Sequence, residues 1–217
     1  MMQYITESLP SMGTSVVYVL VSLIAAFIAK LISDARTRNM DENHEVEENS
    51  NMAVGFSRAG LFMGIFIALS GPLSGEGHTF LNDLMMLAGD SVIAVAFMLI
   101  AREINDRIML TNIKNDVEIK NGNVAVGIFE AGSYIATGLV IAGAFTGQSE
   151  NMVQGWIDAL IFAAVGQVAL LILFWIYEII TPFNVADQMK KGNCAAAVAV
   201  GSMLAALGII LKASIAG

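Results

Sequence analysis

The sequence is poor in charge, in histidine and in cysteine, and each shortage excludes a class of protein. Charged residues make up 14% of the 217 residues, whereas soluble domains carry about 25%. The single cysteine, Cys194, excludes an intramolecular disulfide framework and a zinc site built from cysteines. A secreted disulfide scaffold and an ordinary soluble domain are therefore both excluded.

Basic residues are also scarce, and no catalytic motif is present. The formal net charge is −8, which argues against nucleic acid as a partner. The sequence holds no phosphate-binding loop, no H-E-x-x-H zinc motif and no nucleophile elbow. An aspartate dyad of Asp90 and Asp158 is the enzymatic alternative, but neither residue lies in a protease motif. We therefore expect a protein that is not an enzyme and that needs no cofactor and no metal.

Apolar residues are abundant and fall in long runs. They make up 56% of the chain, and the mean hydropathy is +0.70. A helix that spans a bilayer needs roughly 20 mostly apolar residues. Six segments meet this requirement, at about 12–33, 52–70, 84–101, 123–145, 153–180 and 194–216. The sequence thus predicts an all-α polytopic membrane protein with one membrane domain over residues 1–217. We expect the first segment to be a mature helix, because it is too long for a signal-peptide core and follows no Lys or Arg.

The lysines and arginines gather in alternate loops. The loops after the first, third and fifth segments carry Arg36 and Arg38; Arg102, Arg107, Lys114 and Lys120; and Lys190 and Lys191. The loops at 71–83 and 146–152 carry none. The positive-inside rule then places the three basic loops in the cytoplasm and both termini outside it. His44 and His78 fall on opposite sides of this membrane, which excludes a haem bound by both.

The second, fourth and sixth segments begin in a similar way. Asn51, Asn123 and Asn193 each precede a run of small and apolar residues, at separations of 72 and 70 residues. We interpret the chain as three two-helix units in tandem. Each unit crosses the bilayer twice, so the units are parallel copies related by rotation about the membrane normal. The units cover about 12–75, 81–147 and 152–217.

The connectors before these asparagines allow two interpretations. In the first, each asparagine caps the helix that follows it, and Gly122 or Gly192 ends a short connector helix. Thr181 would cap that short helix in the third connector, with Pro182 at its first position. In the second interpretation, the three asparagines form a polar ring that faces a pathway. The acidic run at 41–48 is typical of a solvated face, and a site for a basic protein or a polyamine is its alternative.

Small residues recur at a spacing of four in the same three segments. The pairs are Gly55/Ala59, Gly60/Gly64, Gly127/Ala131, Gly132/Ala136 and Ala197/Gly201. In lipid, small residues allow the close backbone approach that holds helices together. We expect these three helices to form a tightly packed inner set and the other three to form an outer set. Besides the lipid bilayer, the pattern predicts a homo-oligomer or membrane protein partners.

Four ionisable residues fall inside the apolar segments, namely Arg58, Asp90, Glu130 and Asp158. Arg58 and Glu130 each follow their asparagine by seven residues, about 10 Å in from the helix start. A charge at mid-bilayer costs at least about 2.5 kcal/mol, so partners are expected. The simplest pair is Arg58 with Glu130, within one chain or between subunits. The alternative is that the four charges conduct an ion or a proton.

The G-N-x-A element that opens a small-residue helix occurs at Gly122–Ala125 and Gly192–Ala195, with a weaker copy at Ser50–Ala53. This element and the Thr-Pro-Phe connector at 181–183 resemble an uncharacterised bacterial inner-membrane family that includes YjfL. The resemblance implies a multi-pass inner-membrane protein. It also implies a gene neighbourhood with proteins similar to PspA and to glutathionylspermidine synthase, and hence a role in envelope stress. Members usually have two hairpins, whereas this chain has three.

Two functions of different class are compatible with these observations. In the first, the protein is a packed subunit of a membrane assembly that acts in envelope stress or maintenance. The small-residue faces and the lack of a soluble catalytic part favour it. In the second, the protein is a channel or transporter for an ion or a small cation. The four charges within the spans favour this alternative.

Overall fold

The computed structural model describes residues 2–36, 41–74, 80–111, 113–147 and 151–216 of the chain. These ranges form helices, turns and bends, with no strand. The long helices are α1 (Met2–Arg36), α3 (Met52–Ser70), α4 (Phe80–Ile108), α6 (Val124–Ala144), α7 (Met152–Ile180) and α9 (Cys194–Ala216). The short ones are α2 (Glu42–Glu47), α5 (Asn115–Lys120), α8 (Val185–Lys190) and the 3-10 turn η1 (Pro72–Ser74).

Each of the six apolar segments lies in one long helix, and all six helices are long and apolar enough to cross a membrane. The chain is therefore a multi-pass, all-helical membrane protein. A helix suits the bilayer because it satisfies every backbone hydrogen bond within the segment. Two helices are longer than expected. The helix α1 begins at Met2, and α4 continues past residue 101 to Ile108.

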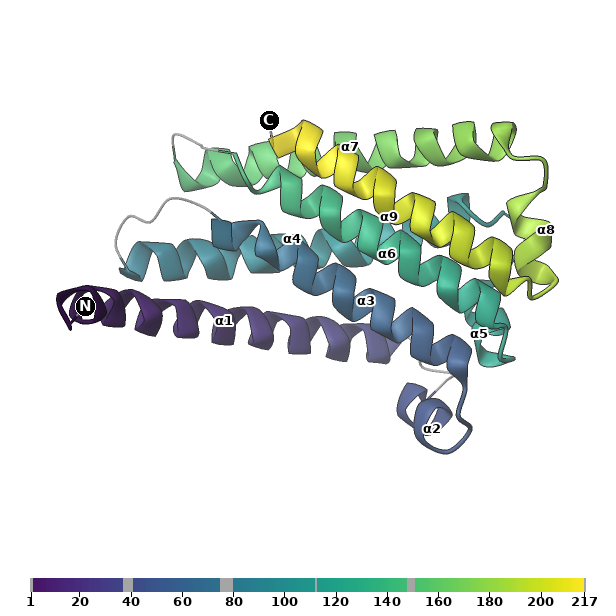
Figure 1. Cartoon of the computed structure of the whole chain (residues 1–217), viewed down its shortest axis with the longest axis horizontal. Helices are drawn as coiled ribbons and strands as arrows, with labels where there is room; N and C mark the ends of the chain where they lie inside the picture. The colour runs from purple at the N-terminus through teal and green to yellow at the C-terminus, as the bar shows by residue number, and fades with distance from the viewer. Residues whose placement is uncertain (1, 37–40, 75–79, 112, 148–150, 217) are drawn as a thin grey trace.

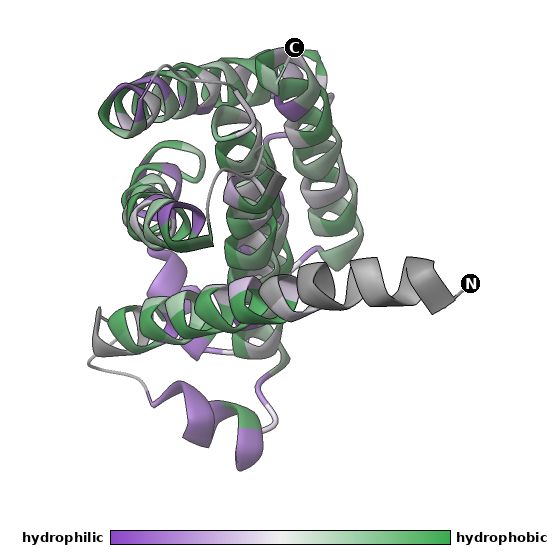
Figure 2. Ribbon diagram, turned by 90° about the vertical axis from the view of Figure 1, so that its left-hand side faces the viewer, coloured by the Kyte–Doolittle hydropathy of each residue, from purple (hydrophilic) through white to green (hydrophobic). Residues whose placement is uncertain are grey.

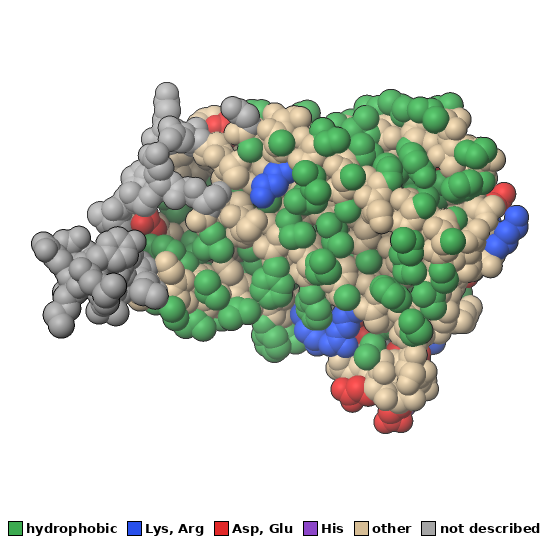
Figure 3. Space-filling model, viewed as in Figure 1, with side chains coloured by type: hydrophobic (Ala, Val, Ile, Leu, Met, Phe, Trp, Pro, Cys, Tyr) green, Lys and Arg blue, Asp and Glu red, His purple; other side chains and the backbone are tan. Residues whose placement is uncertain are grey.

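The long helices run side by side, and the three short connector helices gather at one end of the bundle (Figure 1). The start of α1 and the end of α9 lie toward the opposite end. Hydropathy follows this division, because the long helices are mostly hydrophobic and α2 is hydrophilic (Figure 2). In the space-filling view, hydrophobic side chains cover much of one face and acidic side chains gather over α2 (Figure 3). This distribution suits a bundle whose sides face lipid and whose end faces water.

Helix α6 lies at the centre of the bundle and packs on α3, α4, α7 and α9. Its contacts with α3 and α9 pass through glycines whose backbones meet the neighbouring backbone. A Cβ atom on Gly208 of α9 would lie 2.7 Å from Ala136 Cα, and a Cβ on Gly64 of α3 would lie 2.5 Å from Tyr134 O. Real Cβ atoms do not approach so closely, so these positions require glycine. Close backbone contact of this kind is what small residues allow in membranes.

In the third connector, the start of the short helix differs from the expectation. Thr181 ends α7 and donates its hydroxyl hydrogen bond to Tyr177 O at 2.8 Å, and α8 begins only at Val185. The cap of α8 is Asn184, whose side chain accepts a hydrogen bond from Asp187 N at 2.8 Å. The prediction that Thr181 caps the short helix was therefore wrong. A proline two residues before the cap holds the chain extended, and the helix starts after it.

Candidate functional site

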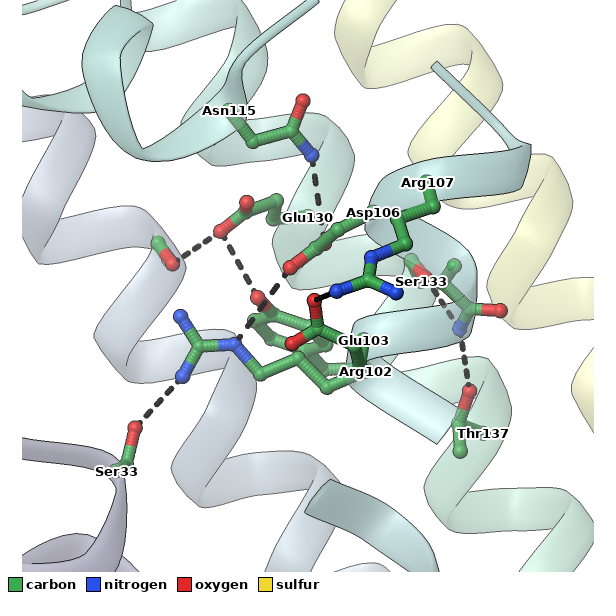
Figure 4. Close-up of polar contacts among 12 residues, drawn as sticks. Ser33, Arg102, Glu103, Asp106, Arg107, Asn115, Glu130, Ser133 and Thr137 are labelled. Atoms are coloured by element: carbon green, nitrogen blue, oxygen red, sulfur yellow. Dashed lines mark hydrogen bonds and ion pairs between the residues drawn. The ribbon is translucent and has the colours of Figure 1, made fainter. Parts of the chain in front are cut away.

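A row of polar side chains lies on one buried face of α6, in the half of the helix nearest the connectors. Glu130, Ser133, Tyr134 and Thr137 are three or four residues apart, a spacing that puts them on one face of a helix. All four are buried, and Glu130 is only 1% exposed. Figure 4 shows this face meeting the end of α4, which supplies Arg102. We call the residues around this contact the polar cluster.

The carboxylate of Glu130 has two hydrogen-bond donors on one of its oxygens. Ser57 Oγ, from α3, donates to Glu130 Oε2 at 2.5 Å, and the Tyr134 hydroxyl donates to the same oxygen at 3.0 Å. The other oxygen, Oε1, is buried and accepts no hydrogen bond from the part of the chain that the structure describes. A buried polar atom without a partner is costly. Oε1 is thus the atom at which a proton, a water or a cation would complete the cluster.

Arg102 is the cation of the cluster and is 5% exposed. Its guanidinium donates to Ser33 Oγ of α1 at 2.6 Å, and its Nε lies 3.9 Å from Asp106 Oδ2. Its Cζ atom lies 5.4 Å from the centre of the Tyr134 ring, a cation–π contact. Arg102 also attracts Glu130 electrostatically. Helices α1, α3, α4 and α6 thus meet through one buried ion group.

A second part of the cluster consists of uncharged amides and hydroxyls. Asn105 Nδ2 donates to Ser133 Oγ and to Thr137 Oγ1, each at 3.0 Å. Gln167 Nε2, from α7, donates to Asn105 Oδ1 at 2.7 Å, and Thr137 Oγ1 donates to Gln167 Oε1 at 3.3 Å. These contacts join α4, α6 and α7. Because the polar atoms of Asn105, Thr137 and Gln167 satisfy one another, this part of the cluster joins helices in the way that polar groups do in membranes.

A small cavity opens beside the ion group, toward the connectors. Its volume is about 10 Å³, and Ser57, Arg58 and Arg102 line it, together with Glu42 and Asp116 of the connector helices. A volume of this size is at the lower limit for one water molecule. A water here would have several charged groups within reach. The cavity is lined by Ser57, which donates to Glu130, and by Arg102, which attracts it.

Arg58 lies next to this cavity but does not pair with Glu130 within the chain. Its Cζ atom lies 5.7 Å above the centre of the Phe62 ring, and the ion pairs of the described residues include none between Arg58 and Glu130. The cation near Glu130 is Arg102. The expected pairing within one chain is therefore corrected, and pairing of Arg58 between subunits remains a prediction. Arg58 is only half-buried, so its charge does not need an anion as its partner.

Asp90 and Asp158 have local partners and lie apart from the cluster. Trp156 Nε1 donates to Asp90 Oδ1 at 2.7 Å, and Gln154 Nε2 donates to Asp158 Oδ1 at 2.8 Å. Asp90 lies twelve residues before Arg102 on α4, which is about 18 Å along the helix. The four predicted charges thus do not form one group: Glu130 belongs to the polar cluster, Arg58 lies beside the cavity, and Asp90 and Asp158 lie elsewhere. Within the ranges that the structure covers, no three His, Cys, Asp or Glu side chains are grouped so that they could hold a metal ion.

The three asparagines lie at the starts of α3, α6 and α9. Asn51 Oδ1 accepts hydrogen bonds from Ala53 N at 3.1 Å and Val54 N at 3.3 Å, and Asn193 Oδ1 accepts one from Ala196 N at 3.2 Å. Asn123 holds the same backbone position but makes no such bond. The glycines before them end the connector turns, with φ of +82° at Gly122 and +69° at Gly192.

The asparagines also bind neighbouring connectors through their amide nitrogens. Asn51 Nδ2 donates to Ile119 O of α5 at 3.1 Å, and Asn123 Nδ2 donates to Met189 O of α8 at 2.9 Å. Asn51 and Asn123 therefore each join their own hairpin to the connector of the next one. A role in linking units accounts for these residues better than a polar ring does.

Several residues of the cluster were missed by sequence reasoning. The apolar segment was expected to end at residue 101, so Arg102 counted only as a cytoplasmic charge beyond it. In the structure α4 continues to Ile108 and Arg102 lies within the helix. Ser57, Tyr134 and Asn105 carried no signal alone. The available signal was the spacing on α6, where four polar residues share one face of an apolar helix.

The comparisons with known proteins agree with a membrane protein. The family model described as Domain of Unknown Function (DUF350) matches residues 4–145 and 151–217. A relative named UPF0719 transmembrane protein, from Aquifex aeolicus (strain VF5), is 26% identical over 200 residues, which cover 91% of this chain and 72% of the relative. No solved structure matches the chain.

Proposed function

Because the chain belongs to the DUF350 family of membrane proteins, we propose that it is a packed helical subunit of a membrane assembly made from copies of itself. The observation that carries this proposal is the unequal enclosure of the inner helices. In α6, 72% of the apolar span is buried, compared with 44% in α3 and 39% in α9. Helices α3 and α9 are thus enclosed on the side of α6 and open on the other. Further copies would enclose them as α6 is enclosed.

The polar cluster fits a structural part in such an assembly. Its hydrogen bonds and ion contacts join five of the six long helices, which gives the bundle one specific arrangement. In a bilayer there is no hydrophobic force between helices, so polar contacts and close packing determine which helices meet. On this proposal the protein has no enzymatic activity, and the cluster keeps its packed surfaces in place.

We further propose a setting in the bacterial inner membrane, with the connectors in the cytoplasm and the termini outside. Lys114, Lys120, Lys190 and Lys191 all belong to the connector end of the bundle, which supports this orientation. The two separate family matches, one of them over a single hairpin, support the interpretation as tandem units. The resemblance to the family that includes YjfL adds envelope stress and maintenance as the role.

The test of the assembly is a mass measurement on the full chain, extracted from the membrane with its surrounding lipid in polymer-bounded discs. The proposal predicts particles with two or more copies at low protein concentration. Particles with one copy at every concentration would overturn it. The role is tested by deleting the gene and challenging the envelope with detergent and with dissipation of the membrane potential. Growth equal to that of the parent strain under all these challenges would remove the envelope role.

A second function is favoured by one specific observation, the unpartnered Oε1 of Glu130 near a water-sized cavity. We infer that, in this case, Glu130 takes up a proton or a small cation from the connector side. Flux into protein-containing liposomes would then fall to that of empty vesicles in Glu130→Gln. The matched control Glu103→Gln, on the neighbouring α4, would keep its flux. Wild-type flux equal to that of empty vesicles under proton, sodium and potassium gradients would exclude transport of these ions.

A further inference from the structure

The contacts of α3 with α6 recur in the contacts of α6 with α9. If the α3 residue is shifted by 72 positions and the α6 residue by 70, three close contacts of the first interface become three close contacts of the second. The matching pairs are Gly60–Ala131 with Gly132–Gly201, Gly64–Gly138 with Ala136–Gly208, and Gly71–Ala142 with Gly143–Lys212. One interface is therefore used twice, each time between a forward face on one helix and a backward face on the next.

The asparagine contacts recur at the same two offsets, 72 for the asparagine and 70 for the carbonyl that it binds. Asn51 binds Ile119 O, and Asn123 binds Met189 O, in each case the carbonyl four residues before the next asparagine. Asn193 is the third member of the set and is exposed. Its Nδ2 donates to Gln188 Oε1 of its own connector at 2.8 Å, as Asn123 Nδ2 does to Glu118 Oε2. A carbonyl of a following connector is what Asn193 lacks within the described residues.

The same offsets identify a third interface, which this chain leaves open at both ends. The forward face of α9 consists of Ser202, Ala206 and Ala213, and the backward face of α3 consists of Ala59, Phe66 and Ser70. All six side chains are exposed. Five of the six are small. The sixth, Phe66, stands where the two interfaces within the chain have Gly138 and Gly208, so the two helices lie farther apart at this contact than in those interfaces.

The outer helices continue the pattern. Helix α4 packs on both α3 and α6, and α7 packs on both α6 and α9, whereas α1 packs on α3 and α4. Only 17% of the apolar span of α1 is buried, compared with 33% in α4 and 39% in α7. Leu23, Phe27 and Leu31 are among its exposed side chains. By the same rule, α1 would also cover an inner helix beside α3, and the described residues supply none there.

We propose that a second copy of this chain supplies both missing neighbours: the forward face of α9 seats on the backward face of α3 in the partner, and Asn193 binds a backbone carbonyl of the α2 connector there. This rests on the proposed function and names its interface. Continuity with the two interfaces inside the chain selects a second copy as the occupant, because α3 carries the face that α9 lacks. The two copies are parallel in the membrane, as the units within one chain are.

The number of copies follows from the directions of the contacts around α6. On α6, Gly132 and Gly143 contact α9 and follow Ala131 and Ala142, which contact α3, by one position, whereas Ala136 contacts α9 and precedes Gly138 by two. At 100° per residue the two directions differ by about 120° on average. This is the interior angle of a hexagon. Each copy brings three inner helices, so two copies close the ring, with the two-fold symmetry that is the commonest in oligomers.

Disulfide cross-linking in native membranes tests the interface. Two differently tagged copies, both with Cys194→Ser, carry one new cysteine each. The matched pairs are Ala59→Cys with Ser202→Cys and Ser70→Cys with Ala213→Cys. The mismatched controls exchange the partners, so that the cysteines lie at different depths. We expect heterodimer bands from the matched pairs only. Bands from matched and mismatched pairs alike, or from neither while the particle mass shows an oligomer, would overturn the interface but leave the assembly standing. A particle of one chain would overturn both.

Asn193→Ala tests the polar part of the interface. We expect the dissociation constant of its dimer to rise about tenfold for each of the two symmetric contacts, because each contact loses one hydrogen bond. The matched control is Asn151→Ala, which removes the exposed cap of α7 and should leave the dissociation constant unchanged. Circular dichroism checks that both variants keep their helices. Equal dissociation constants for the two folded variants would overturn the contact.

Discussion

Helices α6 and α9 start alike but bury different chemistry. Seven residues after its asparagine, α6 has Glu130 and α9 has Val200, and both side chains are buried. The outer helices differ in the same way. Twenty-two residues after its start, α4 presents Arg102, whereas α7 presents Phe174, which packs edge-on against Phe129 at 5.9 Å. One hairpin geometry thus accommodates either an ion group or an apolar contact. The ion group adds a specific choice of partners more than it adds stability.

The strongest test of this comparison is Arg102→Leu, which removes the cation that pairs with Asp106 and attracts the buried Glu130. Removing the cation of a buried ion group costs about 3–5 kcal/mol, so we expect a loss of that size in the free energy of unfolding. The measurement is equilibrium unfolding of the detergent-solubilised chain. The control is Arg107→Leu on the same helix, where the side chain is 75% exposed and bonds to Glu103 at 2.7 Å. An exposed pair of that kind contributes about 0–1 kcal/mol.

The double variant Arg102→Leu with Glu130→Val then gives the α4–α6 contact the apolar character of the α7–α9 contact. Removing a buried anion together with the cation that attracts it leaves no uncompensated charge at Glu130, and such a replacement by apolar groups is often neutral. We therefore expect the double variant to recover most of the stability lost in Arg102→Leu. A double variant that is no more stable than Arg102→Leu would show that the pair is not what the cluster depends on.

A second test compares a glycine in a backbone contact with one in open space. A Cβ on Gly138 would collide with the Gly64 backbone, whereas a Cβ on Gly55 would have nothing within 4 Å. We expect Gly138→Ala to destabilise the monomeric chain by about 1–3 kcal/mol through overpacking. Gly55→Ala should stabilise it by up to about 1 kcal/mol through helix propensity. Thermal unfolding in a detergent that keeps the chain monomeric measures both. Equal shifts in the same direction would contradict the close contact of α3 with α6.

The long helices and their number were predictable, because apolar length alone decides whether a segment can cross a membrane. The small-residue faces were predictable for the same kind of reason, since a spacing of four survives in the helix as a continuous face. The pairing of charges was not predictable. Arg58 and Arg102 are both arginines near a helix end, and only the rotation of α4 against α6 decides which of them meets Glu130. No pattern within a single segment encodes that rotation.

The connectors show the same limit on a smaller scale. Gly122 and Gly192 indicated the turns, because a positive φ favours glycine wherever it occurs. The hydrogen bond from Asn51 to Ile119 O joins residues 68 positions apart. The residues at the start of α3 could not reveal a hydrogen-bond partner in α5, which lies beyond α4 in the sequence. Local chemistry was predictable from the sequence, whereas contacts between units required the fold.

The third test concerns the first connector, which has Ser50 where the others have glycine. Ser50 has φ of +50°, a backbone region that costs a residue with a Cβ about 1–2 kcal/mol. Ser50→Gly should therefore stabilise the protein, by about 0.5–1 kcal/mol after the extra entropy of a glycine in the unfolded chain. The matched control is Asn49→Gly, one residue earlier, which gains nothing because its φ is not positive. Equal melting temperatures for Ser50→Gly and wild type would contradict this account.

The smallest effect concerns Glu45, which precedes Asn51 by six positions. Glu118 and Gln188 hold the corresponding place in the other connectors, five positions before their asparagines. The hydrogen bond from Asn51 Nδ2 to Glu45 Oε2, at 3.2 Å, lowers the pKa of Glu45 below its ordinary value, and Asn49 adds to the effect. Ionised Glu45 therefore adds stability above about pH 4.5, and this contribution is lost as the pH falls through the lowered pKa. Glu45→Gln gives this connector the amide of Gln188, which cannot titrate. We expect the difference in melting temperature between wild type and Glu45→Gln to shrink on acidification. A difference that does not change with pH would mean that the Asn51 amide does not distinguish the two protonation states of Glu45.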